Sequence, residues 1–136
     1  KLTYAQDPKA LTTANHLAPE YVRWEKHRVW VVEGTLKSGA RHIYQKRRFF
    51  LDEDSWTALA SDQYDSSGKL YRGSFAFLSQ SYDKQIPDST PFMIYDFVVG
   101  SYNINGVVGP YGGIRYIDPL SKTQWSAESL AGSGIR

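Results

Sequence analysis

The stretch that decides the fold is Val22–Asp52, which reads VRWEKHRVWVVEGTLKSGARHIYQKRRFFLD. Two runs rich in β-branched and aromatic residues flank Lys37-Ser38-Gly39-Ala40, and this composition predicts two antiparallel strands, Val22–Leu36 and Arg41–Leu51, joined by a tight turn. Gly39 can supply the positive φ that such a turn needs. The register that follows pairs Glu33 with Tyr44, Val31 with Lys46, Val29 with Arg48, His27 with Phe50, Trp30 with Arg47 and Arg28 with Phe49.

Neither face of this predicted hairpin is purely apolar, whereas a half-buried sheet usually alternates more cleanly. We therefore expect the hairpin to cover a core on one side and to face a mixed, aromatic and cationic environment on the other. One face carries Val29, Val31, Tyr44 and Phe50 beside His27 and Arg48, and the other carries Trp24, Trp30, Val32, Ile43 and Phe49 beside Arg28 and Arg47.

The composition limits the class of protein. A length of 136 residues predicts a single domain, 1–136, and the 15% of aromatic residues, with ten Tyr, favours a sheet over a helix bundle. The absence of cysteine excludes disulfide scaffolds, zinc–thiolate sites and cysteine nucleophiles. No apolar run of about 18 residues could form a membrane-spanning helix. The chain begins at Lys1 rather than Met, and we expect it to be a fragment of a longer protein.

The remaining segments predict an antiparallel meander. Residues 1–20 are expected to form a loop with a helical turn between Pro8 and Asn15, 21–108 to form the meander, and 109–136 to form an irregular tail. A second hairpin is predicted from Trp56–Tyr64 and Leu70–Gln80, with a type I turn and a left-handed Gly68 that place Asp62 opposite Arg72. Further strands are expected at Phe92–Val99 and Tyr102–Val108, a polar loop at 85–91, and a short helix at Ser126–Gly132 capped by Ser126. The predicted fold class is mainly β: a curved antiparallel sheet with a short C-terminal helix and long loops.

No motif supports an enzyme. The histidines are His16, His27 and His42, and the two on the predicted hairpin, His27 and His42, are too far apart along it to share a metal. No Gly-x-Ser-x-Gly, Gly-x-Gly-x-x-Gly or Walker sequence occurs. Glu25, Asp52, Glu53 and Asp54 gather at the open end of the hairpin, with Glu25 opposite Asp52, and are best interpreted as a solvated turn. We predict no catalytic residue, no metal site and no cofactor.

The cations of the hairpin are interleaved with aromatic residues, which leaves three interpretations open. The set could bind single-stranded nucleic acid, but the net charge of +2 argues against this because such binding needs a sustained basic field. It could bind an amphiphile, with the acyl chain against Trp and Val and an anionic head group against Arg. It could also pack a core while the cations extend to water. The set comprises Lys26, Arg28, Arg41, Lys46, Arg47 and Arg48 with Trp24, Trp30, Tyr44, Phe49 and Phe50.

Several long segments of this sequence resemble the C-terminal part of proteins in the family called domain of unknown function 1329. Members of this family are often labelled outer-membrane lipoprotein-sorting proteins. The resemblance rests on HRVWVVEGTLK (27–37), RHIYQKRRFFLDEDSW (41–56), DQYD (62–65), GKLYR (68–72), the strand ending Tyr95-Asp96 and the tail SAESLAGSGIR (126–136). It implies a fold similar to the periplasmic carriers LolA and LolB, a curved half-barrel that holds lipid. It also implies that this chain is the C-terminal part of a secreted, periplasmic protein of a Gram-negative bacterium.

The resemblance favours the amphiphile interpretation. We therefore predict a non-enzymatic periplasmic carrier or scaffold for a lipid-like ligand in envelope transport. An outer-membrane protein and a resistance-nodulation-division exporter are the implied partners, and no nucleic acid is expected. The alternative is a protein-interaction module without a small ligand, which could dimerise through open sheet edges. The predicted ligand-binding residues share one face of the hairpin: Trp24, Trp30, Val32 and Phe49 for the chain, with Arg28 and Arg47 near the head group.

Overall fold

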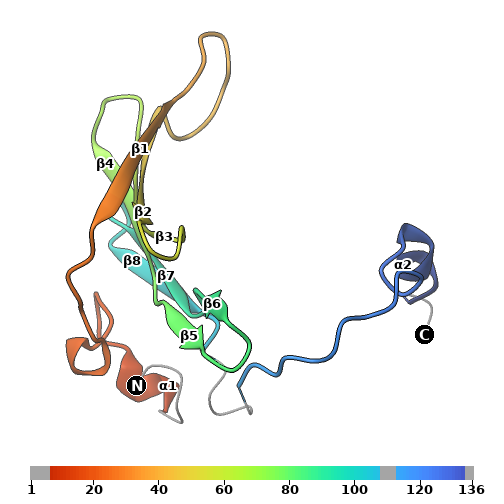
Figure 1. Cartoon of the computed structure of the whole chain (residues 1–136). Coiled ribbons are helices and arrows are strands. Elements are labelled where there is room, and N and C mark those ends of the chain that lie inside the picture. Colours follow the sequence, from red (N-terminus) through yellow and green to blue (C-terminus); the bar gives the residue numbers. More distant parts are fainter. Residues whose placement is uncertain (1–6, 108–112, 134–136) are drawn as a thin grey trace.

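The computed structural model describes residues 7–107 and 113–133, and its main element is an unclosed six-stranded antiparallel sheet (Figure 1). The strand order is β1-β2-β3-β4-β7-β8, so β1 and β8 are the two edges. These strands are β1 (Val29–Thr35), β2 (Lys46–Asp52), β3 (Ala58–Tyr64), β4 (Leu70–Ala76), β7 (Phe92–Asp96) and β8 (Ser101–Asn105). Between β4 and β7 the chain forms a small second sheet from β5 (Ser79–Ser81), at the end of the predicted strand Leu70–Gln80, and β6 (Ile86–Asp88), within the predicted polar loop 85–91. The helices are α1 (Pro8–Leu11), the short 3-10 helix η1 (Pro19–Tyr21) and α2 (Ala127–Ser133), and the predicted mainly-β fold with a short C-terminal helix is confirmed.

The first hairpin forms as predicted, but its register is shifted by four residues. The turn at Lys37–Ala40 is present, with Gly39 at φ +79°. However, β1 ends at Thr35 and β2 begins only at Lys46, and Glu33 pairs with Arg48 rather than with Tyr44. The cause lies in the loop, because the backbone N–H of Tyr44 bonds to His42 Nδ1 at 2.9 Å and leaves the ladder. An even shift keeps every side chain on its face. Val32 and Phe49 are therefore direct partners on the same face as Trp30 and Arg47.

The second hairpin has the predicted turn and an unpredicted bulge. Asp65 Oδ1 accepts from the N–H groups of Ser67 and Lys69, both at 2.9 Å, and Gly68 has φ +78°. A bulge between Gln63 and Tyr64 then moves the pairing by one residue. Gln63, not Asp62, therefore lies opposite Arg72, and the predicted Asp62–Arg72 ion pair is wrong. Arg72 Nε instead donates to Asp96 Oδ2 at 3.0 Å.

The N-terminal segment, predicted to be a loop, provides the main buried core. Leu11 and Leu17 are buried against Met93 of β7, which is only 1% exposed. The segment is fastened to the sheet because Tyr102 Oη donates to the Thr13 carbonyl at 2.8 Å and the Leu17 N–H donates to Tyr95 Oη at 3.4 Å. Residues 22–27, predicted as part of the first strand, are extended without a ladder partner and lead from this core toward β1, where the Arg28 carbonyl accepts from the Glu53 N–H at 3.1 Å.

The opposite end of the sheet and the C-terminal segment are much less covered. On β1, Trp30 is 54% exposed and Val31 57% exposed. The segment from residue 113 to α2 runs away from the sheet, and α2 lies at its far end (Figure 1). Ser126 Oγ accepts from the Ser129 N–H at 3.2 Å, as expected of a helix cap. Of the predicted irregular stretch 109–123, residues 109–112 lie outside the described part and 113–120 have no regular structure. Among the described helices, none has the length and apolar character needed to cross a membrane.

Candidate functional site

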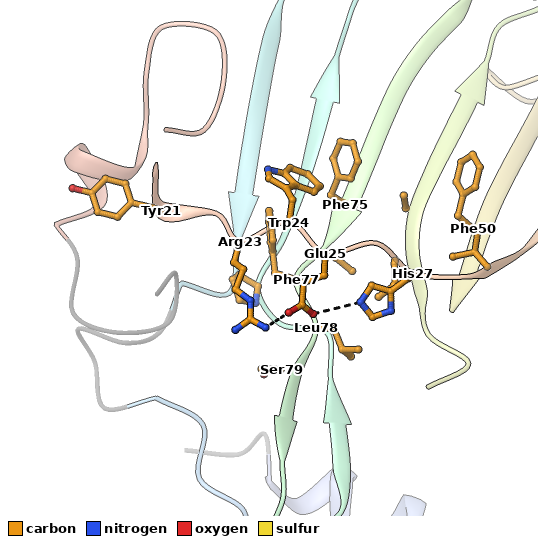
Figure 2. A pocket seen from close by; sticks show the side chains of 15 residues that line it. Tyr21, Arg23, Trp24, Glu25, His27, Phe50, Phe75, Phe77, Leu78 and Ser79 are labelled. Carbon is orange, nitrogen blue, oxygen red and sulfur yellow. Dashed lines mark hydrogen bonds and ion pairs between the residues drawn. The ribbon is translucent and has the colours of Figure 1, made fainter. Parts of the chain in front are cut away.

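An open groove of about 430 Å³ lies between the extended segment Tyr21–His27 and the face of strands β2 to β4 (Figure 2). The strands contribute Phe50 of β2 and Phe75 of β4, and the connection after β4 contributes Phe77 and Leu78. The groove forms here because residues 22–27 pass over the sheet without pairing with it. Its apolar lining is Tyr21, Trp24, Val29, Phe50, Leu59, Phe75, Phe77, Leu78 and Pro91.

Trp24 builds one wall of the groove. Its ring meets Phe75 edge to face, with centroids 5.3 Å apart and an interplanar angle of 84°, and lies 6.5 Å from Phe77. Such edge contacts hold aromatic rings in a defined arrangement. Trp24 is nevertheless 64% exposed, so most of its apolar surface is available to a ligand.

A charged network borders the groove on the same segment. Arg23 forms an ion pair with Glu25, and Glu25 Oε2 lies 3.6 Å from His27 Nε2, as Figure 2 shows. The other ring nitrogen, His27 Nδ1, lies 2.9 Å from Oδ1 of Asp52 at the end of β2. The network thus ties the segment over the groove to the sheet.

Asp52 is the buried member of this network. It is 1% exposed, and its Oδ2 accepts from both the hydroxyl (2.7 Å) and the N–H (2.9 Å) of Ser55. These bonds, the Ser55 hydroxyl first and His27 after it, lower the pKa of Asp52. The predicted solvated turn is therefore wrong for Asp52, whereas Asp54 is exposed. The Ser55 hydroxyl contacts Asp52 and not His27, so the three groups satisfy one another and do not form a Ser–His–Asp nucleophile.

The predicted ligand-binding residues divide between the two faces of the sheet. Trp24 lines the large groove, whereas Phe49 lines a smaller groove of about 220 Å³ on the opposite face. Trp30, Val32 and Arg47 share the face of Phe49 but line neither groove. The expectation of one common face is wrong for Trp24, because the alternation of a strand does not extend into residues 22–28.

Arg28 lies apart from both grooves. Its side chain is 84% exposed and forms an ion pair with Glu53 at 3.5 Å. The ligand-binding role of all six predicted residues stays a prediction.

Three of the lining residues that the sequence did not indicate come from the end of β4 and the connection after it. Phe75, Phe77 and Leu78 follow one another closely, and this run breaks the alternation of a half-buried strand. Such a break could have marked a strand that ends under another segment. Within the described residues, no group of three or more His, Asp or Glu side chains could hold a metal ion.

The chain has a curated relative in one bacterium. Uncharacterized protein PA3922 of Pseudomonas aeruginosa is 45% identical over 100 residues, which cover 71% of this chain and 22% of that protein. The chain therefore spans about a fifth of the length of this curated relative.

Two crystal structures share the fold. One is described as an outer membrane lipoprotein-sorting protein domain from Vibrio parahaemolyticus, with a TM-score of 0.52 and 19% identity over 75% of this chain and 41% of that chain. The other is a DUF1329 family protein from Desulfovibrio piger, with a TM-score of 0.51 and 20% identity over 75% of this chain and 40% of that chain. At these identities the likeness concerns the fold alone. The sequence pattern of DUF1329, a family described as proteins of unknown function, matches residues 1–131, and the chain belongs to this family.

Proposed function

We propose that this chain is part of a non-enzymatic periplasmic carrier, and that the groove beside Trp24 holds the hydrocarbon part of a lipid-like ligand. The observation that carries the proposal is the groove itself. Its volume of about 430 Å³ is in the usual range for small-molecule sites. Its walls are mainly aromatic and aliphatic, and its charged groups all come from the segment Arg23–His27, as expected for a ligand with a long apolar part.

The driving force would be burial of apolar surface, worth about 25 cal/mol for each Å² removed from water. Trp24 offers such surface because it stands on Phe75 and Phe77 without being covered itself. The ligand would complete a core that the N-terminal segment covers only in part. The fold shared with the Vibrio parahaemolyticus domain supports a carrier, since that domain is named for lipoprotein sorting.

The charged border supports binding rather than catalysis. His27 and Asp52 could in principle work as a base and its orienting carboxylate, but the nearby Ser55 hydroxyl is bonded to Asp52. The network anchors the segment that carries Trp24. We therefore assign it the role of holding the groove in shape.

A protein-interaction module is the second candidate, and the edge strand β1 favours it. Trp30 and Val32 on one face of β1 and Val31 on the other are about half exposed, and the outer edge of β1 is unpaired in the sheet. An exposed apolar edge is a template for pairing with another chain. The partner in this case would be an envelope protein, such as an outer-membrane protein or an exporter, or a second copy of this chain.

Native mass spectrometry of the full-length protein, followed by organic extraction and lipid analysis, tests the carrier, with this chain measured in parallel. The matched variants are Trp24→Ala and Trp30→Ala, which remove the same side chain from the groove and from the opposite face. We expect a stoichiometric lipid that Trp24→Ala loses and Trp30→Ala retains.

Other outcomes would redirect or reject the proposal. Loss of the lipid in Trp30→Ala alone would move the site to the face of Phe49. If no lipid accompanies either form and this chain is a dimer that Trp30→Ala dissociates, the interaction module is correct and the carrier is not.

A further inference from the structure

Three polar side chains form a row across the sheet on the face opposite the large groove. Arg47 of β2 is the direct partner of Gln63 in β3, and Gln63 is the direct partner of Arg72 in β4. Partners of this kind lie side by side on one face, with Cβ atoms about 4.5–5.5 Å apart. Tyr44, from the loop before β2, lies against the row: its ring centroid is 4.8 Å from the guanidinium carbon of Arg47 and 6.0 Å from that of Arg72.

The two arginines of the row differ in their counter-charges. Arg72 donates to Asp96 at 3.0 Å and to the Tyr44 hydroxyl at 2.8 Å. Arg47 has no carboxylate within ion-pair distance in the described part of the chain, although its neighbours Lys46 and Arg48 share Glu33. Arg47 is therefore a half-buried cation, held in place by an aromatic ring, that lacks an anion.

His42 does not compensate Arg47. Arg47 Nη2 lies 3.1 Å from His42 Nε2, while the backbone N–H of Tyr44 donates to His42 Nδ1. A neutral imidazole accepts at only one of its nitrogens. When Nδ1 accepts from Tyr44, Nε2 carries a proton and cannot accept from Arg47, whose guanidinium then has N–H groups free for a ligand.

Gln63, between the two arginines, carries a buried polar atom without a partner. It is 8% exposed, its Nε2 donates to Ser61 Oγ at 2.6 Å, and its Oε1 is buried without a partner. An unsatisfied buried polar group costs about 1–3 kcal/mol. Because the Ser61 hydroxyl can donate as well as accept, the amide can turn and present its NH₂ to a ligand.

The row continues directly into the smaller groove. Ser61, which bonds to Gln63, also lines the groove of about 220 Å³ together with Phe49 and Phe92. The row of Arg47, Gln63 and Arg72 thus lies next to the smaller, apolar groove on the same face of the sheet.

We propose that Arg47 and Gln63 form an oxyanion site that binds the phosphate group of an amphiphile, whose hydrocarbon substituent lies in the groove of Phe49 and Phe92. Forked guanidinium donors match phosphate oxygens, and a phosphate has a further oxygen for the amide. This site is on the other face from the groove beside Trp24, so either site can fail without the other.

The test measures binding of dodecyl phosphate, dodecyl maltoside and inorganic phosphate below micellar concentrations by calorimetry, in the full-length protein. Arg47→Gln removes the cation, and Gln63→Glu places a carboxylate where the phosphate would lie. We expect each to weaken dodecyl phosphate binding by about tenfold or more. Arg28→Gln removes the same charge from an exposed position and should change binding by about twofold or less.

The midpoints of thermal unfolding of the same variants serve as the control for folding. We expect them to stay close to that of the wild type, so that a loss of binding is not a loss of fold. Equal weakening by Arg28→Gln and Arg47→Gln would mean general attraction between charges and overturn the site, as would dodecyl maltoside binding as tightly as dodecyl phosphate. Binding of inorganic phosphate that depends on Arg47, without a gain from the dodecyl chain, would support the oxyanion site and overturn its amphiphilic ligand. No binding of either phosphate compound would overturn both parts.

Discussion

The two ends of the six-stranded sheet carry similar apolar side chains but differ in what lies over them. At the β7–β8 end, Met93 is almost fully buried because Leu11 and Leu17 pack on it. At the β1 end, Val31 and Trp30 are more than half exposed. β1 and β7 both carry mainly apolar side chains, so the difference between them comes from the segment that covers one end only. One end of the sheet is therefore packed under the N-terminal segment, and the other leaves apolar side chains exposed to solvent.

The comparison is sharpest for matched substitutions in the two ends. Met93→Ala should lower the free energy of unfolding by about 2–5 kcal/mol, because it leaves a cavity under Leu11 and Leu17. Val31→Ala removes a side chain that already faces water and should cost about 0.5 kcal/mol or less. Urea denaturation of both variants measures the difference. Equal losses would show that β1 is covered in solution and that the two ends do not differ.

The next largest effect on stability is expected at Asp52, where the N-terminal segment is bonded through His27 to the end of β2. Asp52→Asn weakens the bonds to Ser55 and His27 and should cost about 1–3 kcal/mol at neutral pH. The pKa of Asp52 is lowered in the folded state. Its charge therefore stabilises the protein above its unfolded pKa of about 4, and this stability is lost as the pH falls through the folded pKa.

The measurement is the urea midpoint of the wild type and of Asp52→Asn between neutral and acidic pH. The two midpoints should converge as the pH falls, since protonation removes from the wild type the charge that the variant lacks. Asp54→Asn, at an exposed carboxylate of the same turn, is the control and should show no such convergence. A constant gap between wild type and Asp52→Asn would contradict the proposed role of the charge.

The sequence predicted the features that depend on local pattern. The alternation in β1 and β2 placed Val32 on the same face as Phe49, and Gly39 and Gly68 marked the two turns. The strand register could not be predicted, because it depends on Tyr44 bonding to His42 and on a bulge after Gln63. Each is decided by side-chain contacts across the loop or the sheet, and not by composition.

The buried core and the large groove also could not be predicted from the local sequence pattern. Leu11 and Leu17 lie in a segment with no periodicity, and their burial depends on contact with Met93, far away in the sequence. Trp24 was assigned to the wrong face because the sequence gives no sign that pairing begins only at Val29. The half-barrel resemblance therefore predicted the class of fold, while the position of the groove required the structure.

The smallest expected effects come from adding one methyl group at a glycine in each end of the sheet. Gly106, just after β8, has φ +75°, and a Cβ added there would collide with the side chain of Thr90 and lie 3.3 Å from the backbone of Pro91. Gly106→Ala should therefore destabilise the protein by about 1 kcal/mol or more. Gly34, in β1, has no atom within 4 Å of the corresponding position, so Gly34→Ala should stabilise the protein by about 0.4–1 kcal/mol through the unfolded chain. Thermal unfolding of the two variants should thus give shifts of opposite sign. A fall in both would mean that β1 meets another surface in solution, which would place a covering segment or a second copy over the end of the sheet that is open in this structure.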